Sequence, residues 1–213
     1  MGEGQLIVLE GVDGAGTTTH CRQLSERLRR DQRPVHATQE PSGGPMGALL
    51  RQTLTGRMGT PSDGRMQAPA WHTMALMFAA DRMDHVDVEI LPNLREGRTV
   101  ICDRYYHSSV AYQSMMAGAG PDAIDWIRTL NRFARRPDLT IVLDVPPEVA
   151  AERRRGRREA EIFDGDPLQA RLGEFYLELE RHFPEERIVH VSADAPLAEV
   201  AERIHALATG QGQ

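Results

Sequence analysis

Short apolar runs alternate with longer stretches of mixed polarity along the whole chain. The first run, from Leu6 to Leu9, is aliphatic throughout, and the stretch that follows Thr19 repeats its apolar residues at helical spacing. Because these runs are continuous rather than alternating, each predicts a strand buried on both faces, as in a parallel sheet covered by helices on both sides. Five strands are predicted, over Leu6–Glu10, Pro34–Thr38, Thr99–Asp103, Leu139–Asp144 and Ile188–Val191.

The turn between the first predicted strand and the first predicted helix is rich in glycine. Residues 11–18 match the phosphate-binding loop Gly-x4-Gly-Lys-Ser/Thr, except that Thr17 stands at the lysine position. In such a loop, backbone N–H groups and the helix N-terminus bind phosphate oxygens, and the Thr18 hydroxyl would ligate magnesium. A glycine-rich turn without a ligand is the simpler alternative. The candidate ATP-binding residues are Gly11, Val12, Asp13, Gly14, Ala15, Gly16, Thr17 and Thr18.

Composition sharpens the question of charge at this loop. All 25 basic residues are arginines, so the ammonium group that normally neutralises the β- and γ-phosphates cannot come from this chain. The net charge of −6 argues against a general nucleic-acid binder.

Length and cysteine usage indicate one domain in a reducing compartment. The chain has 213 residues, and its cysteines, Cys21 and Cys102, fall in predicted elements where they are expected to be core residues. No apolar run approaches the ~20 residues of a membrane span, and no signal peptide is recognisable. We expect a cytoplasmic domain over residues 1–213, without membrane or nucleic-acid partners, that ends in a disordered tail at 209–213.

Five segments of the chain, in order and over nearly its full length, resemble the motifs of thymidylate kinases. They are Glu10–Gly16, Thr38–Gly44, Leu76–Arg82, Asp103–Gln113 and Leu143–Arg153. The resemblance implies an α/β P-loop NTPase fold and a kinase that transfers the γ-phosphate of ATP to the 5′-phosphate of dTMP, giving dTDP. It further implies Mg²⁺ as cofactor, ATP and dTMP as small-molecule partners, and a homodimer.

The resemblance also implies roles for individual residues. Arg104 and Arg51 would bind the dTMP phosphate, because the planar fork of arginine engages phosphate oxygens in pairs. Phe78 and Arg82 share one helix face and would stack on and read thymine, while Tyr112 would leave no room for a ribose 2′-hydroxyl. The predicted substrate-binding set is Glu40, Arg51, Phe78, Arg82, Arg104, Ser109, Tyr112 and Gln113, and the predicted metal ligands are Thr18 and Asp103.

Simpler interpretations exist for several of these residues. Asp13, where the family carries a carboxylate that holds the acceptor nucleotide, could instead cap the amides of its own turn. Arg51 taken alone would fit a solvated helix face. Phe78 could be a core residue, with Arg82 paired to a carboxylate.

An arginine cluster at residues 153–158 falls in the predicted lid, at about 150–166. The phosphate loop itself contains no arginine, and in such kinases a lid can deliver arginines to the transferring phosphoryl group. Arg153 and Arg157 are expected to share a helix face, and one or the other is hypothesised to take over part of the lysine role. The predicted catalytic set is therefore Asp13, Arg104, Arg153 and Arg157.

Two departures from the family pattern leave other functions open. Gln39 and Ile162 stand where arginines are usual. The main alternative is a catalytically weak or inactive homologue that binds nucleotide for a regulatory or partner-binding role. A further alternative is a kinase for another nucleoside monophosphate.

Overall fold

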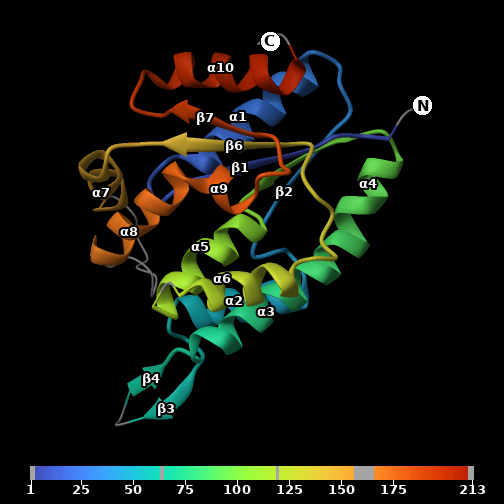
Figure 1. Ribbon diagram of the computed structural model, residues 1–213. Helices are drawn as coiled ribbons and strands as arrows, with labels where there is room; N and C mark the ends of the chain where they lie inside the picture. Colours follow the sequence, from blue (N-terminus) through green and yellow to red (C-terminus); the bar gives the residue numbers. More distant parts are fainter. Residues whose placement is uncertain (1–2, 63–64, 119, 156–165, 211–213) are drawn as a thin grey trace.

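The computed structural model describes residues 3–62, 65–118, 120–155 and 166–210. Its central sheet has five parallel strands in the order β2-β5-β1-β6-β7, so the predicted α/β architecture is confirmed (Figure 1). Each strand lies within one residue of its predicted bounds. The strands are β1 (Leu6–Glu10), β2 (Val35–Gln39), β5 (Thr99–Asp103), β6 (Leu139–Asp144) and β7 (Ile188–Ser192).

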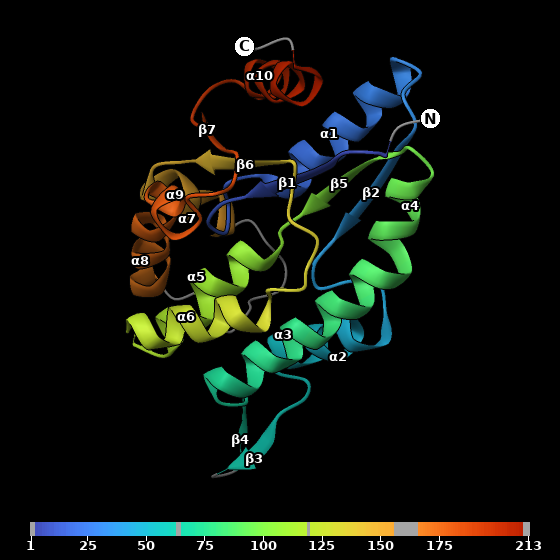
Figure 2. The ribbon, with the colours of Figure 1, turned by 45° about the vertical axis from the view of Figure 1, so that its right-hand side comes forward.

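Helices cover both faces of the sheet. On one face, above the strands in Figures 1 and 2, lie α1 (Thr17–Arg30) and α10 (Leu197–Thr209). Below the strands lie α3 (Trp71–His85), α5 (Tyr106–Met116) and α6 (Pro121–Leu130). The remaining α-helices are α2 (Pro45–Leu54), α4 (Leu91–Arg95), α7 (Pro147–Arg155), α8 (Asp166–Leu177) and α9 (Leu179–His182). None of the helices in the described ranges combines the length and the apolar character needed to cross a bilayer.

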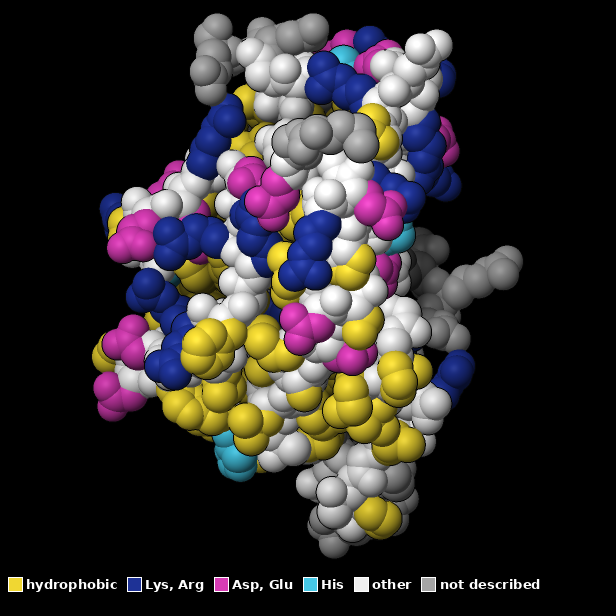
Figure 3. All heavy atoms as spheres, turned by 90° about the vertical axis from the view of Figure 1, so that its right-hand side faces the viewer, with side chains coloured by type: hydrophobic (Ala, Val, Ile, Leu, Met, Phe, Trp, Pro, Cys, Tyr) yellow, Lys and Arg dark blue, Asp and Glu magenta, His cyan; other side chains and the backbone are white. Residues whose placement is uncertain are grey.

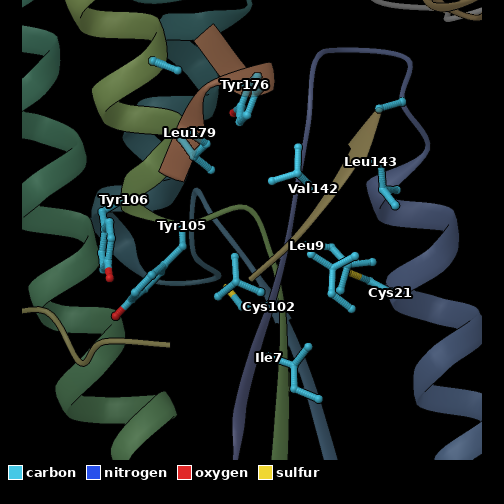
Figure 4. Close-up of a cluster of buried hydrophobic side chains, with 14 of the residues drawn as sticks. Ile7, Leu9, Cys21, Cys102, Tyr105, Tyr106, Val142, Leu143, Tyr176 and Leu179 are labelled. Atoms are coloured by element: carbon cyan, nitrogen blue, oxygen red, sulfur yellow. The ribbon is translucent and has the colours of Figure 1, made fainter. Parts of the chain in front are cut away.

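The core forms where the apolar strands meet these helices. Leu9 of β1 lies beside Cys21 of α1 on one side of the sheet, and Tyr105 and Tyr106 lie on the other side (Figure 4). Cys21 and Cys102 are both buried and free, as expected of small core residues rather than a disulfide. The central strand β1 is buried along its whole length because both of its faces are covered.

Three short elements leave no signal in the apolar pattern. The strands β3 (Thr60–Ser62) and β4 (Arg65–Gln67) form an antiparallel hairpin, and strands of three residues are too short to show a period. A π-helix, η1 (Val86–Ile90), joins α3 to α4.

At the C-terminus, Thr209 is helical, in contrast to the predicted disordered tail, and residues 211–213 lie outside the described ranges.

His190 of β7 contacts Asp144 at the end of β6. We expect this contact to make the stability of the fold depend on pH. His190 Nδ1 lies 2.9 Å from Asp144 Oδ2, and His190 Nε2 lies 3.1 Å from Glu180 Oε1. The hydrogen bond to Asp144 raises the pKa of His190, although burial opposes the shift. Because the folded-state pKa is raised above the unfolded value of about 6.5, the stabilisation is complete below that pH. It is lost as the pH rises through the folded-state pKa.

We therefore expect His190→Gln to lower the Tm more at pH 6 than at pH 9. A contribution of about 1 kcal/mol corresponds to about 2–4 °C in a chain of this size. Thermal unfolding at the two pH values measures the difference, with the exposed His72→Gln as control. Equal losses at both pH values would contradict the charged interaction.

Candidate functional site

A cavity of about 460 Å³ is lined by residues that follow the carboxyl ends of β1, β2 and β5. This is the edge of a parallel sheet where ligands bind. All eight predicted substrate-binding residues line it, namely Glu40, Arg51, Phe78, Arg82, Arg104, Ser109, Tyr112 and Gln113. The same cavity reaches the glycine-rich turn, where Asp13, Gly16, Thr17 and Thr18 line it. Residues from distant parts of the chain therefore share one space.

The glycine-rich turn enters α1 directly. Gly16 precedes the helix with φ 98°, a left-handed conformation that favours glycine. This turns the start of α1 toward the cavity, so the predicted strand, loop and helix are confirmed. Val12 and Ala15 face the core and are buried, with the Ala15 N–H donating to the Val12 carbonyl at 3.0 Å.

The two predicted metal ligands meet at the start of α1. Thr18 Oγ1 donates to Asp103 Oδ2 at 2.5 Å. The other carboxylate oxygen, Asp103 Oδ1, is buried and has no hydrogen-bond partner among the described residues. An orphaned carboxylate oxygen beside a hydroxyl fits Mg²⁺, which prefers oxygen ligands and retains part of its water shell.

Arg104 and Asp13 form an ion pair in the wall of the cavity. Arg104 Nη2 donates to Asp13 Oδ1 at 2.6 Å, and Arg104 Nη1 donates to the Gly11 carbonyl at 3.0 Å. The backbone of Arg104 has φ 67°, which is rare for a residue with a side chain. Such conformations are found where the surroundings fix them, often at functional sites. The pair brings the predicted phosphate-binding arginine onto the phosphate loop.

Asp13 is also held from the far end of the chain. Gln169 of α8 donates from Nε2 to Asp13 Oδ2 at 2.9 Å, and its Oε1 accepts from the Asp13 N–H at 3.2 Å. The Arg104 guanidinium lies over the Tyr112 ring, 5.4 Å from the ring centroid. Burial raises the pKa of Tyr112 above its ordinary value, so the ring carries a neutral phenol. These contacts fix the carboxylate and the ring at the cavity wall.

Arg82 is buried and almost fully occupied by protein partners. Its Nε donates to Glu40 Oε2 at 2.8 Å and its Nη2 donates to Ser109 Oγ at 3.0 Å. Its Nη1 donates to Asn131 Oδ1 at 2.5 Å. On the other side, Glu40 Oε1 lies 3.2 Å from His85 Nδ1. Arg82 thus pairs with a carboxylate, and its guanidinium also lines the cavity, so its role toward a base stays a prediction.

Arg51 is half-buried and faces the turn after β2, not solvent. Its Nη1 donates to the carbonyl oxygens of Pro41 and Ser42, at 3.0 and 2.5 Å. Ser42 in turn donates from N and Oγ to Asp81 of α3, at 2.8 and 2.6 Å. The solvated-face interpretation of Arg51 is thereby excluded. Phe78, one turn before Arg82 on α3, packs partly against the core and also lines the cavity.

A buried carboxylate beneath the cavity holds the start of α5. Glu10 Oε1 accepts the N–H groups of Tyr105 and Ser108, at 2.8 and 3.2 Å. Its Oε2 accepts the hydroxyls of Ser108 and Tyr176, at 2.7 and 2.9 Å. Burial alone would raise the pKa of Glu10, but His107 and Arg104 outweigh it and lower the pKa. Since Ser108 Oγ also lies 3.1 Å from Arg104 Nη1, Glu10 supports the arginine through α5.

The described arginines of the predicted lid contact different parts of the protein. Arg153 Nη2 donates to the Ala193 carbonyl beyond β7 at 3.2 Å. Its charge, after burial, also lowers the pKa of His20. Arg154 Nη1 instead donates to the Asp13 carbonyl in the phosphate loop at 2.9 Å. Arg157 lies outside the described residues, so its role and the shared helix face with Arg153 stay predictions.

Sequence reasoning missed the supporting contacts of Gln169, Glu10 and Arg154. Gln169 lies 156 residues from Asp13 and belongs to no motif. Glu10 was visible only as the first residue of the phosphate-loop segment, and its partners come from α5 and α8. Ser108 lines the cavity and lies within the segment Asp103–Gln113, which is the signal that could have identified it.

Comparison with known proteins agrees with this geometry. A family model described as thymidylate kinase matches residues 9–204. A probable thymidylate kinase of Thermococcus onnurineus is 42% identical over 190 residues, 88% of this chain and 89% of the relative. One from Pyrococcus abyssi is 40% identical over 205 residues, 96% and 95% of the two chains. A thymidylate kinase of Alkalilimnicola ehrlichii is 39% identical over 203 residues, 94% and 90% of the two chains. Both the family match and these relatives extend over most of the chain, which therefore belongs to the thymidylate kinase family.

Proposed function

We propose that this chain transfers the γ-phosphoryl group of ATP to dTMP, giving dTDP. One observation carries the proposal: every predicted acceptor-site residue lines a single cavity that continues into the phosphate loop. Relatives named thymidylate kinase, about 40% identical over most of the chain, support the same activity.

The chain's own residues would act by positioning and by neutralising charge, because phosphoryl transfer needs little covalent chemistry from the protein. Arg104 would hold the dTMP phosphate beside the loop, with Asp13 and Ser108 fixing its fork. Arg51 would approach the same phosphate from α2. When bound, Mg²⁺ would neutralise phosphate charge, held by Thr18 and Asp103.

The base would be read at the other end of the cavity. Phe78 would stack on thymine, and Arg82 would address a base carbonyl from its fixed position between Glu40 and Ser109. Ser109 and Gln113 would complete the polar contacts to the base edge. This set favours thymine over other bases and so argues against a different nucleoside monophosphate.

The direct test is phosphoryl transfer from ATP to dTMP with Mg²⁺, followed by product separation. Formation of dTDP that depends on both substrates is the expected result. Binding of dTMP without turnover would instead favour the inactive homologue with a regulatory or partner-binding role.

We expect the Tyr112 ring to make the enzyme prefer dTMP over its ribose analogue. The ring is fixed beneath the Arg104 guanidinium, so it cannot move aside for a 2′-hydroxyl. We expect kcat/KM for dTMP to exceed that for its ribose analogue by about a hundredfold. Tyr112→Ala should remove most of this ratio, whereas Tyr112→Phe, which keeps the ring, should preserve it. Equal use of both nucleotides by the unmodified chain would refute the steric role.

We also propose that two copies associate. Apolar side chains gather on the face shown in Figure 3, at the level of α3. Leu76 of α3 and Val88 of η1 are exposed, and burial of such a patch by a second copy would remove it from water. Sedimentation equilibrium tests this association.

The buried free thiols, Cys21 and Cys102, fit a reducing compartment such as the cytoplasm.

A further inference from the structure

Arg82 lines the cavity with a guanidinium that the protein holds in one orientation. Its Nε donates to Glu40 and its Nη2 to Ser109, while its Nη1 donates to Asn131. The Tyr105 ring lies against it, with the guanidinium carbon 5.4 Å from the ring centroid. A guanidinium carries five N–H groups in a rigid plane, so these contacts also fix the direction of the N–H groups that remain for a ligand.

One of these partners, Glu40, is itself held by a histidine. His85 Nδ1 lies 3.2 Å from Glu40 Oε1, while the other carboxylate oxygen accepts from Arg82. Because a carboxylate can only accept, the Nδ1 atom carries the proton in this contact. His85 follows Arg82 by three residues on α3, so both side chains lie on the helix face that meets Glu40. Both are buried, and so is the carboxylate between them.

The second nitrogen of the His85 ring is fixed from two other elements. Nε2 lies 2.8 Å from Thr38 Oγ1 of β2 and 3.5 Å from Glu89 Oε2. The other carboxylate oxygen of Glu89 lies 2.7 Å from His36 Nε2. Glu89 belongs to η1, the π-helix that begins directly after His85. π-helical turns are rare and are frequently found at functional sites, and this one lies where the helix supplies a contact to the ring.

The His85 side chain is completely buried, so it can influence a ligand only through the groups that it holds. We propose that His85 is a positioning residue for the nucleotide base. It fixes Glu40 and, through Glu40, the remaining N–H groups of Arg82. The identity of the base, thymine, rests on the proposed function. Without the histidine, the carboxylate would lose one of its two anchors and the guanidinium its fixed direction.

A fixed guanidinium selects a base by the group that it meets. The N–H groups of Arg82 only donate, so they require an acceptor on the base. The C4 carbonyl of thymine, which is the carbonyl remote from the sugar, is such an acceptor, whereas cytosine carries an amino group there that also donates. We therefore expect His85 to contribute to a preference for dTMP over dCMP.

The ratio of kcat/KM for dTMP to kcat/KM for dCMP tests this role, because it does not depend on how much of the protein is folded. His85→Leu fills the site without a polar atom and should lower the ratio by about tenfold to a hundredfold, the effect of one hydrogen bond to a charged group. KM for dTMP should rise while kcat changes by less than about threefold, since the phosphates react at the other end of the cavity. His85→Asn, whose amide can donate to Glu40, should recover most of the ratio.

The matched control is His205→Leu. His205 is also largely buried, and its Nε2 lies 2.8 Å from Asp31 Oδ2, but it belongs to α10 on the other face of the sheet (Figure 1). This variant should change the ratio by less than about twofold, because distant sites act independently. An unchanged ratio in His85→Leu, even with a lower Tm, would mean that His85 only stabilises the fold and would overturn the proposal. No recovery in His85→Asn would overturn it as well.

Binding measurements separate this role from the kinase function. Calorimetry with dTMP or dCMP, in the absence of ATP, should give dissociation constants whose ratio follows the same order among the variants. If no dTDP forms but the binding ratios follow that order, the kinase function is wrong and the positioning role stands. If dTDP forms and His85→Leu keeps the ratio of the unmodified chain, the function stands and the role of His85 is wrong. If the unmodified chain binds neither nucleotide, both are wrong.

Discussion

Arg104→Ala is expected to lower kcat/KM for dTMP by about 10²–10³-fold, the effect of losing one preorganised donor to a reacting phosphoryl group. The Arg104 guanidinium donates hydrogen bonds to three oxygen atoms, those of Gly11, Ser108 and Asp13. Together they fix the orientation of the guanidinium. The protein also holds its backbone in a rare left-handed conformation. So many constraints on one side chain indicate that its position matters for substrate and not only for stability.

Two variants make this result specific. Arg104→Lys keeps the charge but loses the fork, so an intermediate loss is expected. Arg135→Ala removes an arginine that also pairs with an aspartate, Asp138, but outside the cavity, and should leave kcat/KM within about twofold. Steady-state kinetics with dTMP varied gives all three values. A loss for Arg104→Ala no larger than for Arg135→Ala would remove Arg104 from the acceptor site.

Glu10→Ala is expected to lower the free energy of unfolding by about 3–5 kcal/mol, the cost of breaking a buried charged network. The carboxylate is fully buried and accepts four hydrogen bonds, two of them from the first turn of α5. His107 lies 3.7 Å away, and its ring would lose one of its two carboxylate neighbours. Burial alone would lower the pKa of His107, but Glu10 and Glu186 raise it, so the variant would remove one of the two carboxylates that favour the charged ring.

Urea denaturation measures this loss. Glu96→Ala is the matched control, because Glu96 pairs with Arg98 at the surface and should contribute less than about 1 kcal/mol. Glu10→Gln keeps the shape and part of the hydrogen bonding, so it should fall between the two. Equal midpoints for Glu10→Ala and Glu96→Ala would contradict a stabilising role for the network.

The strands and the acceptor residues were predictable because their signals are local. Continuous apolar runs mark strands covered on both faces, and the predicted acceptor residues other than Arg51 fall in segments that the family resemblance covers. Phe78 and Arg82, for example, share a helix face by spacing alone. Their common cavity follows from the parallel sheet, whose carboxyl ends gather at one edge.

The supporting contacts could not be predicted, because they depend on packing between distant elements. Gln169 reaches Asp13 only through the angle at which α8 meets the sheet. Which of Arg153 and Arg154 contacts the loop depends on which face of α7 meets it, and sequence spacing fixes faces only relative to one another. A Cβ atom at Gly14 would lie 2.5 Å from the Ala150 carbonyl oxygen, and this close backbone contact sets that phase.

The close approach of Gly14 to the Ala150 backbone also couples the glycine-rich loop to α7. A side chain at residue 14 would require α7 to move away, and the arginines on α7 would move with it. A residue larger than glycine at position 14 is therefore incompatible with the observed placement of α7. Any larger residue at position 14 would therefore need compensating changes in α7.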